Sequence, residues 1–335
     1  MWRERYNWFQ HRLKQLEAEA AQNGGNLKRS DHWRATYYRD PYLIRATDDE
    51  YFQRFCDVFH NQVYLTENGQ IAPLDVLQND SNLMRKFTAL MEEQSFRVAI
   101  TGELIQAANE PLNKYFDGGG PIGVTLFKGV DEPDGPYLVK FSKKEYVEQM
   151  LHTGTFRVSP ASLYSNGSLL HAQQDLETER EFIIPTYDKI LKGYDHVNVE
   201  GMKFNVTQTD PQIRVSVPDY YLLSLCRDMD RRMPTDFDAD AALIIKDRKR
   251  FQRLFFDQLR DVLKGWDFKN GDVDYYDPYL DFMRYKVPEM TKHFRFHYQK
   301  EFRIVARPKK PVAIDLEPFF VEIGPMHEYA EMCSV

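Results

Sequence analysis

Cysteine is scarce in this chain of 335 residues, and its scarcity argues against two ways of stabilising a fold. The three cysteines, Cys56, Cys226 and Cys333, lie far apart and form no Cys-x-x-Cys pair. Isolated cysteines in an odd number support neither a disulfide framework nor a structural zinc site. We therefore expect a protein of a reducing compartment, which favours a cytoplasmic location.

Long apolar runs are also missing. The longest, Tyr220 to Cys226 and Ala241 to Ile245, fall far short of the roughly 20 residues that a membrane-spanning helix needs. Met1 to Leu13 alternates charged with aromatic residues and has no apolar centre, so it does not resemble a signal peptide. The sequence predicts no membrane span, although hydrophobic residues make up 42% of the chain, enough for a substantial core.

Acidic residues outnumber basic residues in the whole chain, 51 to 44, but not at the N-terminus. The net charge of -7 argues against indiscriminate binding to nucleic acid. Residues 1–45 differ, because nine Lys and Arg face five acids there, with aromatics among them. Proteins that bind RNA or single-stranded DNA combine basic and aromatic side chains in this way. A helix with a solvated charged face and aromatic residues in the core would show the same pattern. These aromatics are Trp2, Tyr6, Trp8, Phe9, Trp33, Tyr37 and Tyr38.

Apolar spacing divides the chain into two regions. Residues recurring at three and four positions predict helices at 6–16, 51–59 and 83–91, so residues 1–130 form a mainly helical region for partner or substrate binding. The turn-rich stretch Asp131 to Pro136 marks a boundary. A domain of strands and helices over 137–333 follows, which makes the fold class α+β. Strands are expected at 137–141, 155–159, 220–226, 241–245 and 319–323, and helices at 143–151 and 251–263.

The stretch from His293 to Val305 has the most chemical content. Phe294, Phe296, Tyr298, Phe302 and Ile304 alternate with polar residues, among them Gln299, Glu301 and Arg303, which predicts one long strand. On such a strand Gln299 and Glu301 project on the same side, roughly 7 Å apart. A carboxylate so placed can bind a ribose hydroxyl and stabilise an oxocarbenium ion when a glycosidic bond breaks.

Three segments together resemble the mono-ADP-ribosyltransferase superfamily of the Gln-x-Glu type. They are the strand Tyr137 to Phe141, the stretch Gly154 to Ser162, and the stretch Tyr298 to Ile304. The order of elements over about the last 200 residues is similar to that of bacterial toxin and phage-defence proteins with this fold. The resemblance implies an ADP-ribosyltransferase-like split β-sheet with flanking helices.

The resemblance also implies site residues and partners. Glu301 would be the catalytic glutamate, and Gln299 would orient the substrate. Lys140 and Phe141 on the first strand, with Ser159, Ser162 and Tyr164 after the second, would bind NAD. The implied reaction transfers ADP-ribose from NAD to a macromolecular acceptor, RNA/DNA or protein, and a neutralising antitoxin would be a further partner.

Two other interpretations remain open from the sequence. The alternating acids Asp175, Glu177, Glu179 and Glu181 would suit a metal-dependent nuclease, although such a row is more often a solvated edge. The sheet would otherwise be the scaffold of a non-catalytic binding module. His293 and His297 have a metal-like spacing but lack the glutamate of a zinc protease helix, so we predict no metal.

Overall fold

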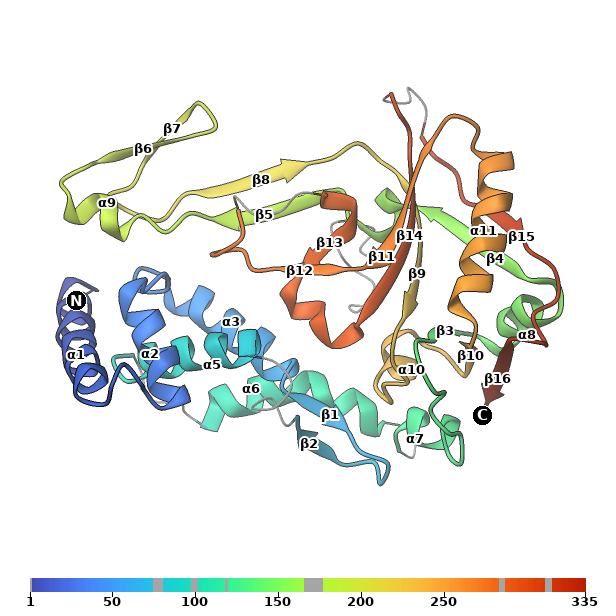
Figure 1. Ribbon diagram of the computed structural model, residues 1–335, viewed down its shortest axis with the longest axis horizontal. Coiled ribbons are helices and arrows are strands. Elements are labelled where there is room, and N and C mark those ends of the chain that lie inside the picture. The colour runs from blue at the N-terminus through green and yellow to red at the C-terminus, as the bar shows by residue number, and fades with distance from the viewer. Residues whose placement is uncertain are drawn as a thin grey trace.

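A computed structural model of the chain describes residues 2–74, 81–97, 102–117, 120–165, 177–282, 287–310 and 315–335. Helices gather at the N-terminal end of the molecule, and a large antiparallel sheet occupies the other end (Figure 1). The predicted mixture of helix and sheet is confirmed, with helices mainly in the first third. None of the helices in the described part of the chain combines the length and the apolar character that a membrane span requires.

The N-terminal helices form where apolar residues have helical spacing. In α1 (Trp2–Gln22), Phe9, Leu13 and Leu16 are buried, as the spacing predicted. α3 (Asp48–His60) begins after Thr47, which exchanges hydrogen bonds with Glu50 in a reciprocal cap that fixes the first turn. The other elements of this region are α2 (Arg29–Arg39), β1 (Val63–Leu65), β2 (Ile71–Pro73), α5 (Ser81–Gln94), α6 (Gly102–Asn113), a 3-10 helix (Lys114–Phe116) and α7 (Ile122–Leu126).

Most aromatic residues near the N-terminus pack inward. Phe9 stacks on Tyr38 with ring centroids 5.2 Å apart, and the buried Tyr37 hydroxyl donates to Glu93. Trp8, 38% exposed, is an exception. The packed-core interpretation therefore describes most of these rings. Arginines of the same segment form ion pairs within the protein: Arg5 with Glu93, Arg34 with Glu92, Arg39 with Glu17 and Arg45 with Asp210.

The large sheet has the strand order β11-β14-β9-β3-β10-β16, and its neighbouring strands run antiparallel. The two most apolar strands, β9 and β10, lie inside it, as predicted. β4 and β15 branch from β9. The strands are β3 (Leu138–Ser142), β4 (Thr155–Pro160), β9 (Tyr221–Cys226), β10 (Ala241–Ile245), β11 (Asp267–Asp272), β14 (Glu301–Arg307), β15 (Phe319–Glu322) and β16 (Ala330–Ser334).

The sheet splits along the edge of β9 that faces away from β14. Cys226, at the end of β9, pairs with Val139 of β3, whereas Leu222 pairs with Ser159 of β4. Ser224 lies between these two pairings. The strands β3 and β4 therefore diverge at Ser224, and this place is called the split below.

Helices cover both faces of the sheet. α8 (Lys144–Thr153) and α11 (Arg248–Val262) bury Val147, Phe251 and Phe255 against one face. On the other face, Leu126 at the end of α7 and Met233 at the start of α10 (Met233–Asp236) share a core with β3 and β10. The predicted helices at 143–151 and 251–263 are thus confirmed.

Several short elements were not predicted. A ribbon of β5 and β8 leaves the sheet and extends over the N-terminal helices, with α9 and the β6-β7 hairpin at its far end (Figure 1). β12 and β13 form a small parallel pair beside β14. Their bounds are β5 (Glu179–Ile183), α9 (Tyr187–Leu191), β6 (His196–Val199), β7 (Met202–Asn205), β8 (Gln212–Ser216), β12 (Asp274–Tyr276) and β13 (Thr291–His293), with 3-10 helices at Ala161–Ser165 and Pro288–Met290.

The long strand expected over 293–305 is wrong in its first half. A 3-10 helix occupies Phe294–Gln299, Lys300 takes a left-handed conformation with φ of 43°, and only then does β14 begin. The physical reason is Asn61 of the N-terminal region. Its side-chain amide donates to the carbonyl of Phe294 and accepts from the N–H of Tyr298, thereby binding peptide groups that a strand would pair elsewhere.

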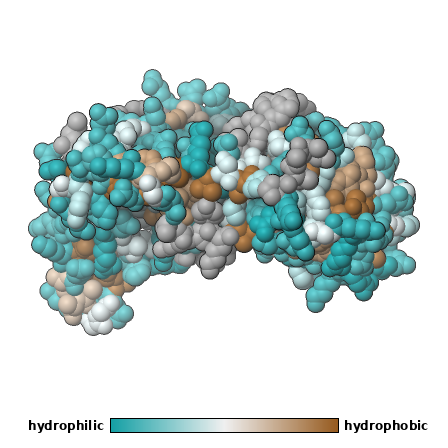
Figure 2. Space-filling view, turned by 90° about the horizontal axis from the view of Figure 1, so that it is seen from above, coloured by the Kyte–Doolittle hydropathy of each residue, from teal (hydrophilic) through white to brown (hydrophobic). Residues whose placement is uncertain are grey.

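The helical region and the sheet region share a core. Tyr187, Tyr279 and Phe294 belong to the same buried cluster as the N-terminal helices. Arg54 of α3 forms a buried ion pair with Asp277, at 2.6 Å. The two stretches, 1–130 and 137–333, thus pack against each other. Their division into separate domains stays a prediction from the sequence. Seen from above, hydrophobic residues form separate patches on a largely hydrophilic face, one of them toward the end that carries α11 and β15 (Figure 2).

Candidate active site

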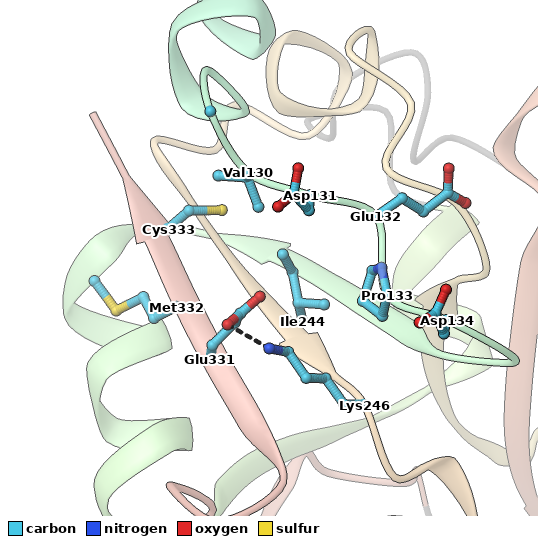
Figure 3. Close-up of a pocket in the computed structure, with 11 residues that line it drawn as sticks. Val130, Asp131, Glu132, Pro133, Asp134, Ile244, Lys246, Glu331, Met332 and Cys333 are labelled. Atoms are coloured by element: carbon cyan, nitrogen blue, oxygen red, sulfur yellow. Dashed lines mark hydrogen bonds and ion pairs between the residues drawn. The ribbon is translucent and has the colours of Figure 1, made fainter.

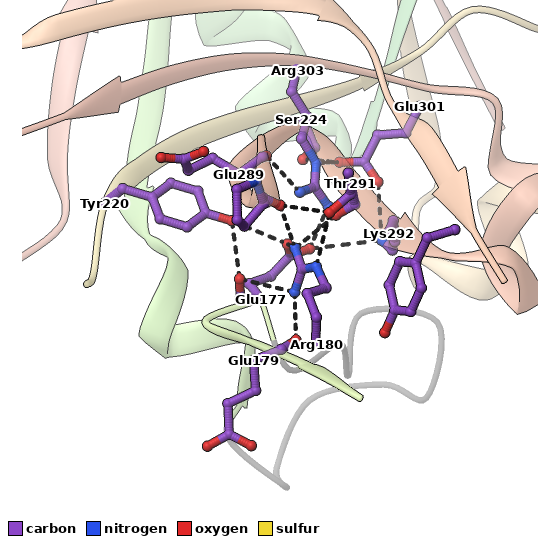
Figure 4. A network of polar contacts seen from close by, with 12 residues as sticks. Glu177, Glu179, Arg180, Tyr220, Ser224, Glu289, Thr291, Lys292, Glu301 and Arg303 are labelled. Carbon is purple, nitrogen blue, oxygen red and sulfur yellow. Dashed lines mark hydrogen bonds and ion pairs between the residues drawn. The ribbon is translucent and has the colours of Figure 1, made fainter. Parts of the chain in front are cut away.

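Glu301 is buried at the first position of β14, where three donors hold its carboxylate (Figure 4). Oε1 accepts from Ser224 Oγ at 2.5 Å and from Arg303 Nε at 2.6 Å, and Oε2 accepts from Lys292 Nζ at 2.9 Å. Burial alone would raise the pKa of Glu301. The positive charges of Arg303 and Lys292 outweigh burial and lower that pKa below its usual range, so the carboxylate is ionised.

Lys292 joins the two residues that sequence reasoning paired. Its Nζ donates to Gln299 Oε1 at 3.0 Å as well as to Glu301, so the amide and the acid meet at one ammonium group. Gln299 does not lie on the strand, because it ends the 3-10 helix. The predicted meeting of Gln299 and Glu301 therefore occurs by a different geometry, in which both side chains are buried rather than presented on one open strand face.

Two further charges complete a buried network. Glu177 accepts from Arg303 Nη2 at 2.5 Å and lies 3.5 Å from Arg180 Nη2. We call Glu177, Arg180, Ser224, Lys292, Gln299, Glu301 and Arg303 the polar cluster. Among these residues three cations face two carboxylates, which leaves one positive charge in excess. Because the cluster lies in a water-poor interior, that excess would act strongly on an anionic ligand.

Three of the residues assigned to NAD lie at the split beside the cluster. Lys140 Nζ donates to the backbone carbonyl of Ser224 at 2.8 Å. Burial lowers the pKa of Lys140, and the nearby Glu301 partly opposes this. Tyr164 is hydrogen-bonded to Ser159, and burial together with the charges of Glu177 and Glu301 raises the Tyr164 pKa to about 12. Lys140 therefore contacts the backbone of the β9 residue whose hydroxyl binds Glu301, and the charge of Glu301 reaches Tyr164.

Two other predicted NAD contacts lie elsewhere. Phe141 points to the opposite face of β3, where it packs in the core with Phe127 and Phe237. Ser162 is exposed, and its hydroxyl donates to Asp219 at 2.6 Å. The structure gives Phe141 a packing role and places Ser162 beside Asp219, ahead of β9, rather than in the polar cluster.

Sequence reasoning missed several members of the cluster. Arg303 shared the polar parity of Glu301, which was a usable signal for its position on the same side of β14. Lys292 and Arg180 gave no signal, because Lys292 comes from a separate short strand and Arg180 from the β5 ribbon. Ser224 stood in an apolar strand with no histidine nearby, and its role depends on the pairing of β9 with β14.

The acidic row does not act as a unit in the described residues. Asp175 lies outside them. Glu177 is bound by Arg303 and Arg180, while Glu179 and Glu181 lie on β5. In the described part of the chain no three His, Cys, Asp or Glu side chains converge as metal ligands would.

Two hollows are candidates for ligand binding. One, of about 600 Å³, lies between residues 129–134 and the strands β10 and β16, where Lys246 pairs with Glu331 at 2.6 Å (Figure 3). It shares no residue with the polar cluster. The other, of about 820 Å³, lies between α2, α5 and residues 274–281 and is called the tyrosine cleft. Its wall residue Tyr275 accepts a hydrogen bond from the Glu301 N–H at 2.7 Å, so this cleft adjoins the cluster.

Comparison of the chain with protein-family models, curated proteins and solved structures found no significant match.

Proposed function

We propose that this protein is an NAD-dependent mono-ADP-ribosyltransferase with Glu301 as its catalytic residue. The observation that supports the proposal is the ionised Glu301 beside the split, where Ser224, Lys140 and Tyr164 approach it from three other segments. An ionised carboxylate in a water-poor site stabilises a neighbouring positive charge far better than it would in bulk water. The order of elements resembling the superfamily agrees with this arrangement.

In the proposed reaction the bond between the ribose C1′ and the nicotinamide nitrogen of NAD breaks, and its electron pair leaves with nicotinamide. Glu301 stabilises the positive charge that develops on the ribose. A nucleophilic atom of the acceptor then attacks C1′ and releases its proton. The excess positive charge of the polar cluster and Lys140 would attract the pyrophosphate.

Access to Glu301 requires a change among its three donors. Arg303 and Lys292 are charged and buried, so displacing either would leave an unpaired charge. Ser224 is neutral and only partly buried, and a ribose hydroxyl supplies the same donor. We therefore expect the ribose to replace the Ser224 hydroxyl at Glu301 Oε1.

The test is release of nicotinamide from NAD, and transfer of labelled ADP-ribose to a cell lysate, by wild type and Glu301→Gln. Glutamine keeps the size but removes the charge, so we expect a loss of roughly 10²- to 10³-fold in either activity. Treating the labelled product with protease or nuclease then distinguishes a protein acceptor from RNA/DNA. Because toxin or phage-defence roles come with the resemblance, wild type should also slow bacterial growth more than the variant.

Glu289→Gln is the matched control. Glu289 is also a buried carboxylate paired with an arginine, Arg307, at 2.9 Å, but it lies outside the polar cluster. Thermal unfolding of both variants separates loss of fold from loss of chemistry. A wild-type protein that neither cleaves NAD nor transfers ADP-ribose, or a folded Glu301→Gln variant with full activity, would refute the proposal.

A further inference from the structure

The strand β16 forms one edge of the large sheet, toward the end of the molecule opposite α1 (Figure 1). It pairs with β10 on one side, and no described strand pairs with its other side. Proteins usually protect such an edge with charged side chains or proline, because its backbone groups otherwise bind extended chains. The edge strand β11 carries Asp267, Lys269 and Asp272. β16 has no such protection, since its one charged residue, Glu331, is paired with Lys246.

The hydrogen-bond pattern shows which residues of β16 face outward. The N–H of Lys246 donates to the Tyr329 carbonyl at 2.8 Å, so residue 329 faces β10. Facing groups alternate along an antiparallel pair, and residues 331 and 333 therefore face β10 as well. The N–H and carbonyl groups of Met332 and Ser334 point to the outer side, where no described residue bonds to them. An added strand pairs with residues spaced in this way.

The hollow of about 600 Å³ beside this edge is acidic (Figure 3). Its lining holds one cation, Lys246, which Glu331 neutralises at 2.6 Å. One of its other carboxylates accepts a hydrogen bond from the neutral Tyr137 hydroxyl, at 2.7 Å. Three lining carboxylates have no cation within ion-pair distance in the described part of the chain: Asp131, Glu132 and Asp134. The hollow therefore favours a positively charged ligand.

A strand added to β16 would bring its side chains to this hollow. Neighbouring strands lie about 4.8 Å apart, so a Lys or Arg side chain is long enough to cross β16 and reach the acids. Because side chains alternate between faces, basic residues at every second position would point to the hollow together. A second copy of this chain fits poorly, since pairing two β16 strands would bring two acidic hollows and two Glu331 side chains together.

We propose that the outer edge of β16 binds an extended peptide segment of another protein, with Lys or Arg at alternate positions. The peptide backbone pairs with Met332 and Ser334, and the basic side chains enter the acidic hollow. Main-chain pairing supplies affinity, and the alternating charges supply specificity. This surface shares no residue with the polar cluster, so peptide binding does not depend on NAD chemistry.

The experiment measures the fluorescence anisotropy of a labelled heptapeptide of alternating lysine and threonine, titrated with the full chain at low salt. We expect binding, and none when glutamate replaces lysine. If the peptide is antiparallel to β16, as the strands of this sheet are to one another, its threonine N–H groups face β16 and its lysine N–H groups face water. N-methylation of the threonines should weaken binding roughly 2- to 10-fold for each bond removed, and N-methylation of the lysines is the matched control.

Variants of the protein test the edge and the hollow separately. Ser334→Pro removes an outward N–H and no bond to β10, so it should weaken peptide binding roughly 2- to 10-fold, whereas Ser334→Ala keeps this N–H and should bind as wild type does. Asp131→Asn combined with Asp134→Asn should weaken binding roughly 2- to 30-fold, the value of two exposed ion pairs. Asp261→Asn, at an exposed position outside the hollow, is the control, and thermal unfolding establishes that each variant is folded.

Three results would overturn the inference. The first is absence of binding by the basic peptide. The second is equal affinity of the parent peptide and both N-methylated peptides, because charge alone would then account for binding. The third is a wild type that forms dimers in sedimentation while Ser334→Pro stays monomeric, because a second copy of the chain would then occupy the edge.

Discussion

Replacing Asp277 by asparagine should weaken the fold by roughly 2 to 4 kcal/mol at pH 7. Asp277 is 1% exposed, and both its oxygens accept from Arg54, at 3.0 and 2.6 Å. Burial alone would raise the Asp277 pKa, but Arg54 and Lys86 lower it from 3.8 to about 2. That shift corresponds to about 2 kcal/mol, and leaving the Arg54 charge buried without its partner costs roughly 3 to 5 kcal/mol.

Urea unfolding followed by circular dichroism measures this loss. Asp257→Asn is the control, because its pair with Arg260 is largely exposed and should contribute less than about 1 kcal/mol. The folded-state pKa of Asp277 is depressed, so its contribution is complete above about pH 4 and is lost as the pH falls towards 2. The variant should lack this component of the acid transition. A loss below about 1 kcal/mol at pH 7 would refute the reasoning.

Three other variants test separate features. Gly154→Ala should lower the free energy of urea unfolding by more than about 2 kcal/mol, because φ is +69° and a Cβ would lie 2.3 Å from the Gly324 carbonyl oxygen. The control Gly135→Ala has open space around it and should cost only about 1 kcal/mol. Burial raises the Asp57 pKa to about 6, so wild type loses stability as the pH rises from 4 to 6. Asp57→Asn should therefore raise the free energy of unfolding by about 2 kcal/mol at pH 7, and an unchanged free energy would contradict this cause. Burial and Arg295 lower the His293 pKa to about 3, so wild type loses stability as the pH falls from 6.5 towards 3. His293→Asn should flatten the profile of unfolding free energy over this pH range, and a profile like that of wild type would contradict the cause.

Elements whose apolar pattern is local could be predicted from the sequence. The α1 stripe of Phe9, Leu13 and Leu16 and the apolar strands β9 and β10 were found at nearly their observed bounds. Their burial follows from the spacing of apolar residues, because that spacing identifies the face of the helix, or both faces of the strand, that must be removed from water. The same reasoning singled out Gln299 and Glu301, although Gln299 lies outside the strand that the reasoning assumed and meets Glu301 through Lys292.

Features that depend on partners far along the chain could not be predicted in this way. Asn61 binds the backbone of residues 294–298 and thereby prevents the strand that their alternation favours. Glu177 and Arg303, 126 positions apart, meet only after β5 and β14 have been placed. Neither residue signals its partner, since alternation specifies a face of a strand and says nothing of what lies opposite.

The polar cluster is difficult to explain as a device for stability. Taking charges out of water costs several kcal/mol for each ion, and well-packed apolar residues often replace a buried ion pair without loss. Here five charged side chains, each with at most 5% of its surface exposed, meet beside the place where β3 and β4 diverge. Buried charges with shifted pKa values gather preferentially at functional sites. If replacing Glu301 and Arg303 together by glutamine and methionine leaves the free energy of unfolding unchanged or higher, the pair is not kept for stability, and binding or chemistry at the split becomes the remaining physical reason for it.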